Sequence, residues 1–281
     1  SLEELLRLEV GAIDWELDKN KTDNYIRLST NASTGEKHDF VRSIYDDERP
    51  SQKKLVNLVE DYINHYDFPI LASHNIAFDL MQPRDKVTAF RIGTDGSSPV
   101  IKGRVGDTKM MRDEDGNAIG RKGFLKVELA GRQLFCSMSY ARNNFWFPNN
   151  KLETVATYLG RPYEKGLDYG ELEELSQKAS NGDVGARETI KKYCLEDAKT
   201  HYKLAKRLLP IALTEALAFE TDLISVCFNA KSTLASKLKD KRYFEKLHTF
   251  RPDRTLEMQE FGVFEAKIDL LKEKLSKNKK D

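Results

Sequence analysis

The most regular pattern in the sequence is helical, and it places an acidic residue in the middle of an apolar face. At about 100° per residue, residues 187–209 separate into one apolar stripe and one opposite stripe of charged side chains. This pattern predicts an amphipathic helix that Pro210 ends. Asp197 falls near the centre of the apolar stripe. Because an isolated buried carboxylate is costly, Asp197 needs a hydrogen-bond partner or a bound cation.

Both explanations of Asp197 stay open at this point. As a structural residue it would be hydrogen-bonded by a neighbour, and His201, one turn later on the same stripe, is the first candidate. As a metal ligand it would join other oxygen donors, since hard cations prefer carboxylates. Tyr193 lies one turn before Asp197 on the same stripe, which gives this helix a Y-x-x-x-D pattern.

The sequence before this helix predicts an α/β fold. The segments with strand signals are residues 8–17, 25–30, 36–45, 68–72 and 132–136. The third of these is expected to pair back on the second. The segments with helix signals run from the N-cap Ser51 through residue 63, from Ile76 onward, and over residues 151–160. The glycine-rich stretch 91–124 is expected to form loops or a hairpin inserted into the fold.

We expect two parts, an α/β domain over residues 1–210 and a helical C-terminal extension over 211–281 with a basic tail. A hydrophobic content of 40% is enough for a packed core and excludes general disorder. The 46 Lys and Arg residues nearly cancel the 45 Asp and Glu residues, for a net charge of +1. This balance excludes a histone-like mode of nucleic-acid binding but allows a local basic groove.

The expected location of the protein in the cell rests on membrane-span and signal-peptide patterns, neither of which is visible in the sequence. Its apolar runs are far too short to span a membrane, and no signal peptide is visible. We therefore expect a cytoplasmic or nucleoid-associated protein with no membrane partner. Its cysteines, Cys136, Cys194 and Cys227, are scattered without a C-x-x-C motif, which fits a reducing compartment and argues against a structural zinc site.

Two acidic motifs precede the helix. Asp14 and Glu16 are two residues apart on a predicted strand, so their carboxylates share one face and can reach one metal site. Asn75 follows a predicted buried strand, and Asp79 lies one turn later on the same face of the next helix. Alternatively, Asn75 is only a helix cap and Asp79 only favours the helix dipole. His74 is expected to be a hydrogen-bonded packing residue.

The four carboxylates can converge if the sheet is of the ribonuclease H type, and their mutual repulsion then favours bound hard cations. With Tyr193, the set resembles the tyrosine-containing branch of the DEDD superfamily of 3′–5′ exonucleases, most closely the proofreading domain of family-B DNA polymerases. The matching motifs are Asp14-Trp15-Glu16 with D-x-E, Asn75-Ile76-Ala77-Phe78-Asp79 with the second motif, and Tyr193 to Asp197 with Y-x-x-x-D. Gly131-Arg132 and the L-x-T-V-A-x-x-L-G segment from Leu152 to Gly160 are similar to further landmarks.

This resemblance covers about residues 8–210 and implies a two-metal phosphodiesterase that uses Mg²⁺ or Mn²⁺. It implies that Asp14, Glu16 and Asp197 bind one ion and that Asp14 and Asp79 bind the other. Tyr193 would orient the attacking water, and Asn75 and Phe78 would shape the slot for the terminal nucleotides.

The implied partner is the 3′ end of a single-stranded nucleic acid, with DNA favoured over RNA, and a replication or repair protein is a further candidate partner. The sequence contains no Y-x-D-T-D polymerase motif, so an exonuclease-like unit without polymerising domains is expected, either stand-alone or as half of a split polymerase. The alternative is a non-catalytic nucleic-acid-binding or replication accessory subunit. Aromatic residues between Tyr140 and Phe147 either stack on unpaired bases or, by preference, pack in the core.

Overall fold

A five-stranded mixed sheet forms the centre of the first of two compact units into which the chain divides, Ser1–Lys231 and Ser232–Asp281. The computed structural model describes residues 4, 7–17, 29–34, 38–47, 51–81, 90–105, 110–112, 118–121, 124–161, 163 and 166–249. In order across the sheet, the strands are β3 (Asp39–Ser43), β2 (Ser29–Thr34), β1 (Val10–Leu17), β4 (Ile70–Ser73) and β9 (Gln133–Cys136).

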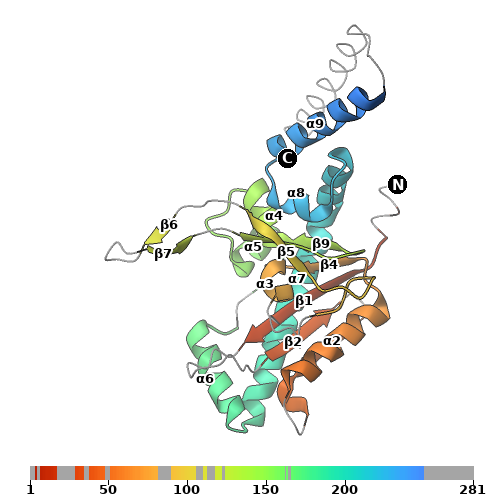
Figure 1. Ribbon diagram of the computed structural model, residues 1–281. Helices are drawn as coiled ribbons and strands as arrows, with labels where there is room; N and C mark the ends of the chain where they lie inside the picture. Colours follow the sequence, from red (N-terminus) through yellow and green to blue (C-terminus); the bar gives the residue numbers. More distant parts are fainter. Residues whose placement is uncertain are drawn as a thin grey trace. The chain divides into compact units, whose positions relative to one another are not determined.

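The central strand β1 joins an antiparallel half of the sheet to a parallel half. It pairs antiparallel with β2, which pairs antiparallel with β3, and on its other side it runs parallel to β4. Strand β4 in turn runs parallel to β9. Helices flank this sheet, as Figure 1 shows. The predicted α/β class, with a ribonuclease H-like mixed sheet flanked by helices, is confirmed.

The helices of the first unit are α2 (Gln52–Tyr66), α3 (Ile76–Met81), α4 (Ser137–Asn144), α5 (Leu152–Tyr158), α6 (Tyr169–Ser180), α7 (Val184–Ala218) and α8 (Leu223–Phe228), with a short 3₁₀ helix η1 (Ile44–Asp46). Helix α7 packs against β1, β2 and β3. Its buried side chains include Ile190, Cys194, Asp197, His201 and Leu204, so the predicted stripe is the face that meets the sheet.

Helix α7 is longer than the sequence predicts, because it passes through Pro210 and ends at Ala218. Proline removes the hydrogen bond to the carbonyl four residues earlier, that of Lys206, and both residues lie on the exposed side of the helix, where water can replace this bond. Beyond the proline, Ala212 and Leu213 are buried. The expectation that Pro210 ends the helix was wrong because packing of this following turn outweighs the cost of the proline.

Other boundaries differ less. Strand β2 is centred later than the predicted segment 25–30, of which residues 25–28 lie outside the described residues. Helix α2 begins after Ser51, whose hydroxyl accepts a hydrogen bond from the backbone N–H of Lys54, as predicted. Helices α4 and α6 were not predicted. In the inserted stretch, β5 (Val100–Val105) pairs with β8 (Phe124–Glu128) and β6 (Met110–Arg112) pairs with β7 (Ala118–Arg121), which confirms a hairpin-like insertion.

The helical pattern predicted after residue 210 is confirmed as far as the structure describes the chain. After α8, helix α9 spans Lys231–Thr249, and the remainder of the predicted helical segment lies outside the described residues. The assignment of residues 1–210 and 211–281 to separate functional parts stays a prediction. Among the helices that are described, none combines the length and apolar character that crossing a membrane requires.

Gly131 and Arg132 anchor the start of β9. Gly131 has a φ of +74°, and a Cβ at this position would lie 1.7 Å from Oγ1 of Thr94, so only glycine fits. The buried guanidinium of Arg132 donates hydrogen bonds to the backbone carbonyls of Ile92 and Phe68, at 2.6 and 2.7 Å. This motif therefore has a structural role, because it ties the parallel edge of the sheet to the segments around it.

Candidate metal-dependent active site

A cavity of about 750 Å³ opens beside the end of β1 and the start of α3. All seven residues predicted from the sequence for the site line it: Asp14, Glu16, Asn75, Phe78, Asp79, Tyr193 and Asp197. They come from three elements that are far apart in the chain, β1, the β4–α3 junction and α7. The fold therefore brings the three predicted acidic motifs to one place.

Three of the four carboxylates form a tight cluster. Oxygen atoms of Asp14, Glu16 and Asp197 lie within 4.8 Å of one another. Asp14 and Glu16 share a face because side chains alternate along β1. Asp197 joins them because α7 is fixed against β1 on both sides of it: the Cys194 thiol lies 3.7 Å from the carbonyl oxygen of Asp14, and Nδ1 of His201 lies 3.0 Å from that of Ile13.

Asp79 lies next to this cluster but outside the set of three. Its side chain is 3% exposed and accepts a hydrogen bond from the hydroxyl of Ser73. The first turn of α3 is closed by the carbonyl of Asn75, which accepts backbone hydrogen bonds from Phe78 and Asp79 at 2.8 and 3.2 Å. The strand-to-helix junction therefore directs the Asp79 carboxyl into the same cavity.

The four acids repel one another when they are ionised. Burial, followed by the charges of Glu16, Asp79 and Asp197, raises the pKa of Asp14 well above its ordinary value. Burial and the charge of Asp197 raise the pKa of Asp79 to about 8, against the opposing hydrogen bond from Ser73. An all-oxygen set with this much mutual repulsion suits hard cations such as Mg²⁺ or Mn²⁺ rather than zinc, which prefers nitrogen and sulfur ligands.

Two tyrosines border the cluster, and the sequence predicted only one of them. Tyr163 donates a hydrogen bond from its hydroxyl to Oδ1 of Asp197. Tyr193 lies one turn before Asp197 on α7 and lines the same cavity. Burial and the negative charge of Asp197 raise the pKa of both phenols, so both stay protonated and can donate hydrogen bonds at neutral pH. Tyr163 follows the L-G landmark by a few residues in a segment without periodicity, so no sequence pattern pointed to it.

The two histidines in the cavity wall are structural. His74 makes hydrogen-bond contacts with the Ser137 hydroxyl, at 2.9 Å, and the carbonyl of Asn150, at 2.8 Å. Burial lowers the pKa of His74 to about 4 and that of His201 to about 3, so both rings are neutral near pH 7. The expectation for His74 is confirmed. His201, the first candidate partner for Asp197, directs Nδ1 to the carbonyl of Ile13, whereas Tyr163 donates a hydrogen bond to Asp197.

Aromatic side chains near the cavity divide into packed and exposed ones. Phe145 and Phe147 stack on each other and pack against a core cluster that includes Val155. Trp146, between them, is fully exposed. Phe78 is 42% exposed and lines the cavity, which leaves an aromatic surface next to the carboxylates.

The sequence is 27% identical over 173 residues to a DNA polymerase of Desulfurococcus sp. (strain Tok). The chain is distantly related to part of a DNA polymerase. The similarity covers 59% of this chain but 19% of the polymerase, so the chain corresponds to about a fifth of the length of that relative. No protein-family model matches the sequence.

Proposed function

We propose that this chain is a metal-dependent 3′–5′ exonuclease that removes nucleotides from the 3′ end of nucleic acid, with single-stranded DNA as its preferred substrate. It would act stand-alone or as a proofreading unit. The observation that carries the proposal is the convergence of Asp14, Glu16, Asp79 and Asp197 in one cavity beside Tyr193. The distant relationship to part of a DNA polymerase supports nucleic acid as the substrate.

In the proposed mechanism, two divalent cations would supply an activated water and stabilise the leaving 3′-oxygen, as in other two-metal phosphodiesterases. Asp14, Glu16 and Asp197, whose oxygens lie within 4.8 Å of one another, would hold the first cation. Asp14 and Asp79 would hold the second.

The remaining residues would position the substrate and the water. The Tyr193 hydroxyl, which stays protonated, would orient the attacking water. The side chains of Asn75 and Phe78 would border the slot for the terminal nucleotides, with the exposed ring of Phe78 available for stacking on a base.

The cavity favours catalysis over the alternative of a non-catalytic binding subunit. Phosphates bind to positive charge, and neutralising contacts from Lys and Arg dominate the affinity of binding proteins. Four carboxylates in one cavity would repel a phosphodiester unless cations neutralise them. A surface that only binds nucleic acid would gain from losing these acids, whereas a metal-dependent nuclease requires them.

The test is the shortening of 5′-labelled single-stranded DNA from its 3′ end in Mg²⁺ or Mn²⁺, with EDTA abolishing it. Asp14→Ala, Asp79→Ala and Asp197→Ala should each remove essentially all of this activity while the protein stays folded, because each would be a direct metal ligand. Asp61→Ala is the matched control, since Asp61 is an exposed aspartate on α2 that does not line the cavity. Product ladders on gels and circular dichroism melts give the two readouts.

Matched DNA and RNA oligonucleotides in the same assay would settle the substrate class. A cavity variant that kept near-wild-type rates would remove its residue from the proposed site. Wild-type protein that bound the strand but left it intact in both metals would favour the accessory-subunit alternative.

A further inference from the structure

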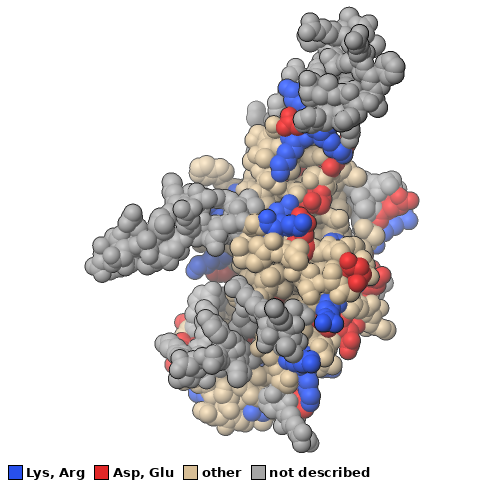
Figure 2. All heavy atoms as spheres, viewed as in Figure 1, with Lys and Arg blue, Asp and Glu red and all other residues tan. Residues whose placement is uncertain are grey.

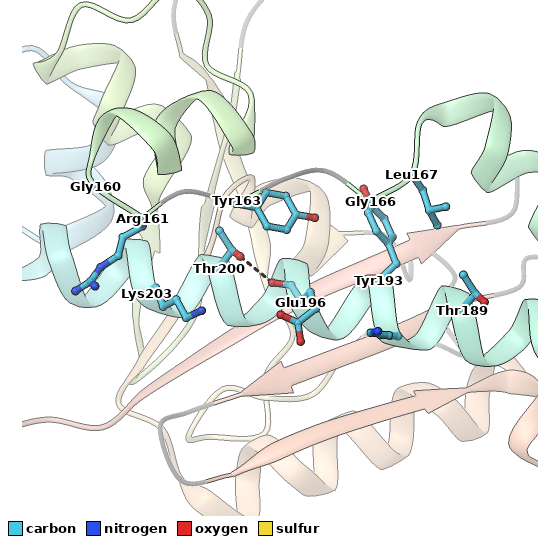
Figure 3. A pocket seen from close by; sticks show the side chains of 11 residues that line it. Gly160, Arg161, Tyr163, Gly166, Leu167, Thr189, Tyr193, Glu196, Thr200 and Lys203 are labelled. Atoms are coloured by element: carbon cyan, nitrogen blue, oxygen red, sulfur yellow. Dashed lines mark hydrogen bonds between the residues drawn. The ribbon is translucent and has the colours of Figure 1, made fainter.

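A second groove, of about 600 Å³, lies on α7 next to the carboxylate cavity. Its floor consists of side chains along α7, and its far wall is formed by described residues that follow α5, namely Gly160, Arg161, Tyr163, Gly166 and Leu167. Figure 3 shows Arg161 and Lys203 at one end, Thr189 at the other, and the rings of Tyr163 and Tyr193 between them. Apart from Tyr193, none of the residues that line this groove has a role in the proposed nuclease.

The groove has a positive lining. Arg161, Lys192 and Lys203 line it, and within the described part of the chain none of the three forms an ion pair. Among the described residues that line it, the single carboxylate is that of Glu196, which lies 3.4 Å from Nζ of Lys199. Three cations beside a single, already paired carboxylate leave an excess of positive charge, which suits phosphate.

The two cavities share a boundary. Tyr163 and Tyr193 line both of them, so the groove and the carboxylate cavity lie on either side of the same two phenols. The side chain of Tyr163 reaches Asp197 from this boundary, and Figure 3 shows the two rings extending toward each other above α7.

The groove could bind phosphate from two sources, a nucleic-acid strand or a released mononucleotide, and the length of the groove distinguishes them. Lys192 and Lys203 are eleven residues apart on one continuous helix, which places them about 16 Å apart along its axis. One phosphate group cannot contact both cations. Several successive phosphates of a strand can, and a positive groove that follows the backbone is how single strands are bound without sequence preference.

We infer that this groove binds the phosphodiester backbone of the strand whose 3′ end lies in the carboxylate cavity, through Arg161, Lys192 and Lys203. The inference rests on the proposed function for the identity of the strand. It adds a binding site several nucleotides long outside the reaction centre.

The experiment measures binding of labelled (dT)₁₂ by fluorescence anisotropy in Mg²⁺, which neutralises the neighbouring carboxylates, with phosphorothioate linkages at the 3′ end of the strand so that hydrolysis does not interfere. Removing one cation that neutralises a phosphate should reduce the slope of log K against log salt concentration by about 0.7, which corresponds to about eight-fold in affinity between 1 M and 50 mM salt. Lys192→Ala and Lys203→Ala should each show this reduction in slope, and the double variant should show the sum of the two reductions. Lys53→Ala, an exposed lysine on α2, is the control that should retain the wild-type slope.

Three outcomes separate the possibilities. Variants that bind (dT)₁₂ with wild-type affinity and salt slope would overturn the inference, even if the chain degrades DNA. Loss of strand affinity in a chain that degrades nothing would support the groove and refute the nuclease. Variants that bind (dT)₁₂ as wild type does, but whose nuclease activity dTMP no longer inhibits, would assign the groove to a released mononucleotide and overturn the inference. Melting temperatures equal to wild type confirm folding.

Discussion

At the residue scale, the site depends on side chains that hold the carboxylates as much as on the carboxylates themselves. Tyr163 contacts Asp197 directly, and Ser73 contacts Asp79. Groups that hydrogen-bond to metal ligands fix the orientation of those ligands, and their removal typically costs 10- to 100-fold in metal affinity or activity. The sequence pointed to the acids because they fall in motifs, but not to Tyr163, whose position depends on how its segment returns to α7.

The two tyrosines should therefore differ in what their loss affects. Tyr163→Phe removes the hydrogen bond to Asp197, so we expect Mn²⁺ to bind about ten-fold more weakly. Tyr193→Phe removes the proposed water-orienting hydroxyl, so we expect kcat to fall about 100-fold while metal affinity stays near wild type. Mn²⁺ titrations of binding and of activity measure both quantities. Equal losses of metal affinity in the two variants would contradict this division of roles.

Asp79 should make the stability of the metal-free protein depend on pH. Its pKa is raised from 3.8 to about 8, so the folded protein holds a proton that the unfolded chain has released. The free energy of unfolding in EDTA should therefore fall as the pH rises from 3.8 to about 8. Between pH 6.5 and 8 the two histidines do not interfere, because His74 and His201, with lowered pKa values, raise stability with pH only below about 6.5. Asp14, whose pKa is also raised, contributes with the same sign as Asp79.

Asp79→Asn should lose much of this dependence and melt at the same temperature as wild type, or higher, in EDTA at pH 8. Thermal melts at pH 6.5 and pH 8 measure the difference. If the variant instead loses more than about 1 kcal/mol at both values, Asp79 is a structural helix-start residue, of the kind whose loss costs about that much.

At the element scale, the sequence predicted most of what positions the site. The face of α7 follows from its 3.6-residue period, and the strands β1, β4 and β9 follow from short apolar runs between turn residues. Segments whose structure depends on distant partners were not predictable in this way. Strand β2 is defined by its pairing with β1 and β3 rather than by its own composition, and α7 passes Pro210 because the next turn packs on the unit.

Pro210 offers a direct test of this account of α7. Pro210→Ala should restore one backbone hydrogen bond at an exposed helical position, so the free energy of unfolding should increase by about 1 to 3 kcal/mol. Lys206→Ala, at an exposed position one turn earlier, should change it by less than about 0.5 kcal/mol. Denaturant unfolding measures both. A less stable Pro210→Ala variant would show that the proline is needed for a local distortion of the helix.

At the scale of the whole molecule, a nearly neutral composition conceals an uneven distribution of charge. In Figure 2, basic and acidic side chains are interspersed over the face in view instead of forming one broad basic patch. The two concave sites are the exception, since six acids and one lysine line one, and three cations and one glutamate line the other. The net charge of the chain could not predict this separation, because it sums over all residues wherever they lie.

Metal binding should stabilise the folded chain as a whole. An ion that binds the folded state alone stabilises it by RT ln(1 + [L]/Kd), about 2.7 kcal/mol at 100 times Kd. Mn²⁺ should therefore raise the melting temperature of wild type, and should raise that of Asp14→Asn clearly less, because Asp14 would contact both ions. Differential scanning calorimetry with and without Mn²⁺ measures the shift. A wild-type melting temperature unaffected by millimolar Mn²⁺ would contradict the metal site.

The attachment of α7 to β1 on both sides of Asp197 also limits how this protein can evolve. Contacts at Cys194 and His201 fix the rotation of the helix, and one inserted or deleted residue between them would turn everything that follows by about 100°. Such a change would break one contact and separate the carboxylate cavity from Lys203 of the neighbouring groove. Among descendants that keep both sites, gains and losses of residues should accumulate in the inserted hairpins between 91 and 124, while 194–201 changes by substitution alone.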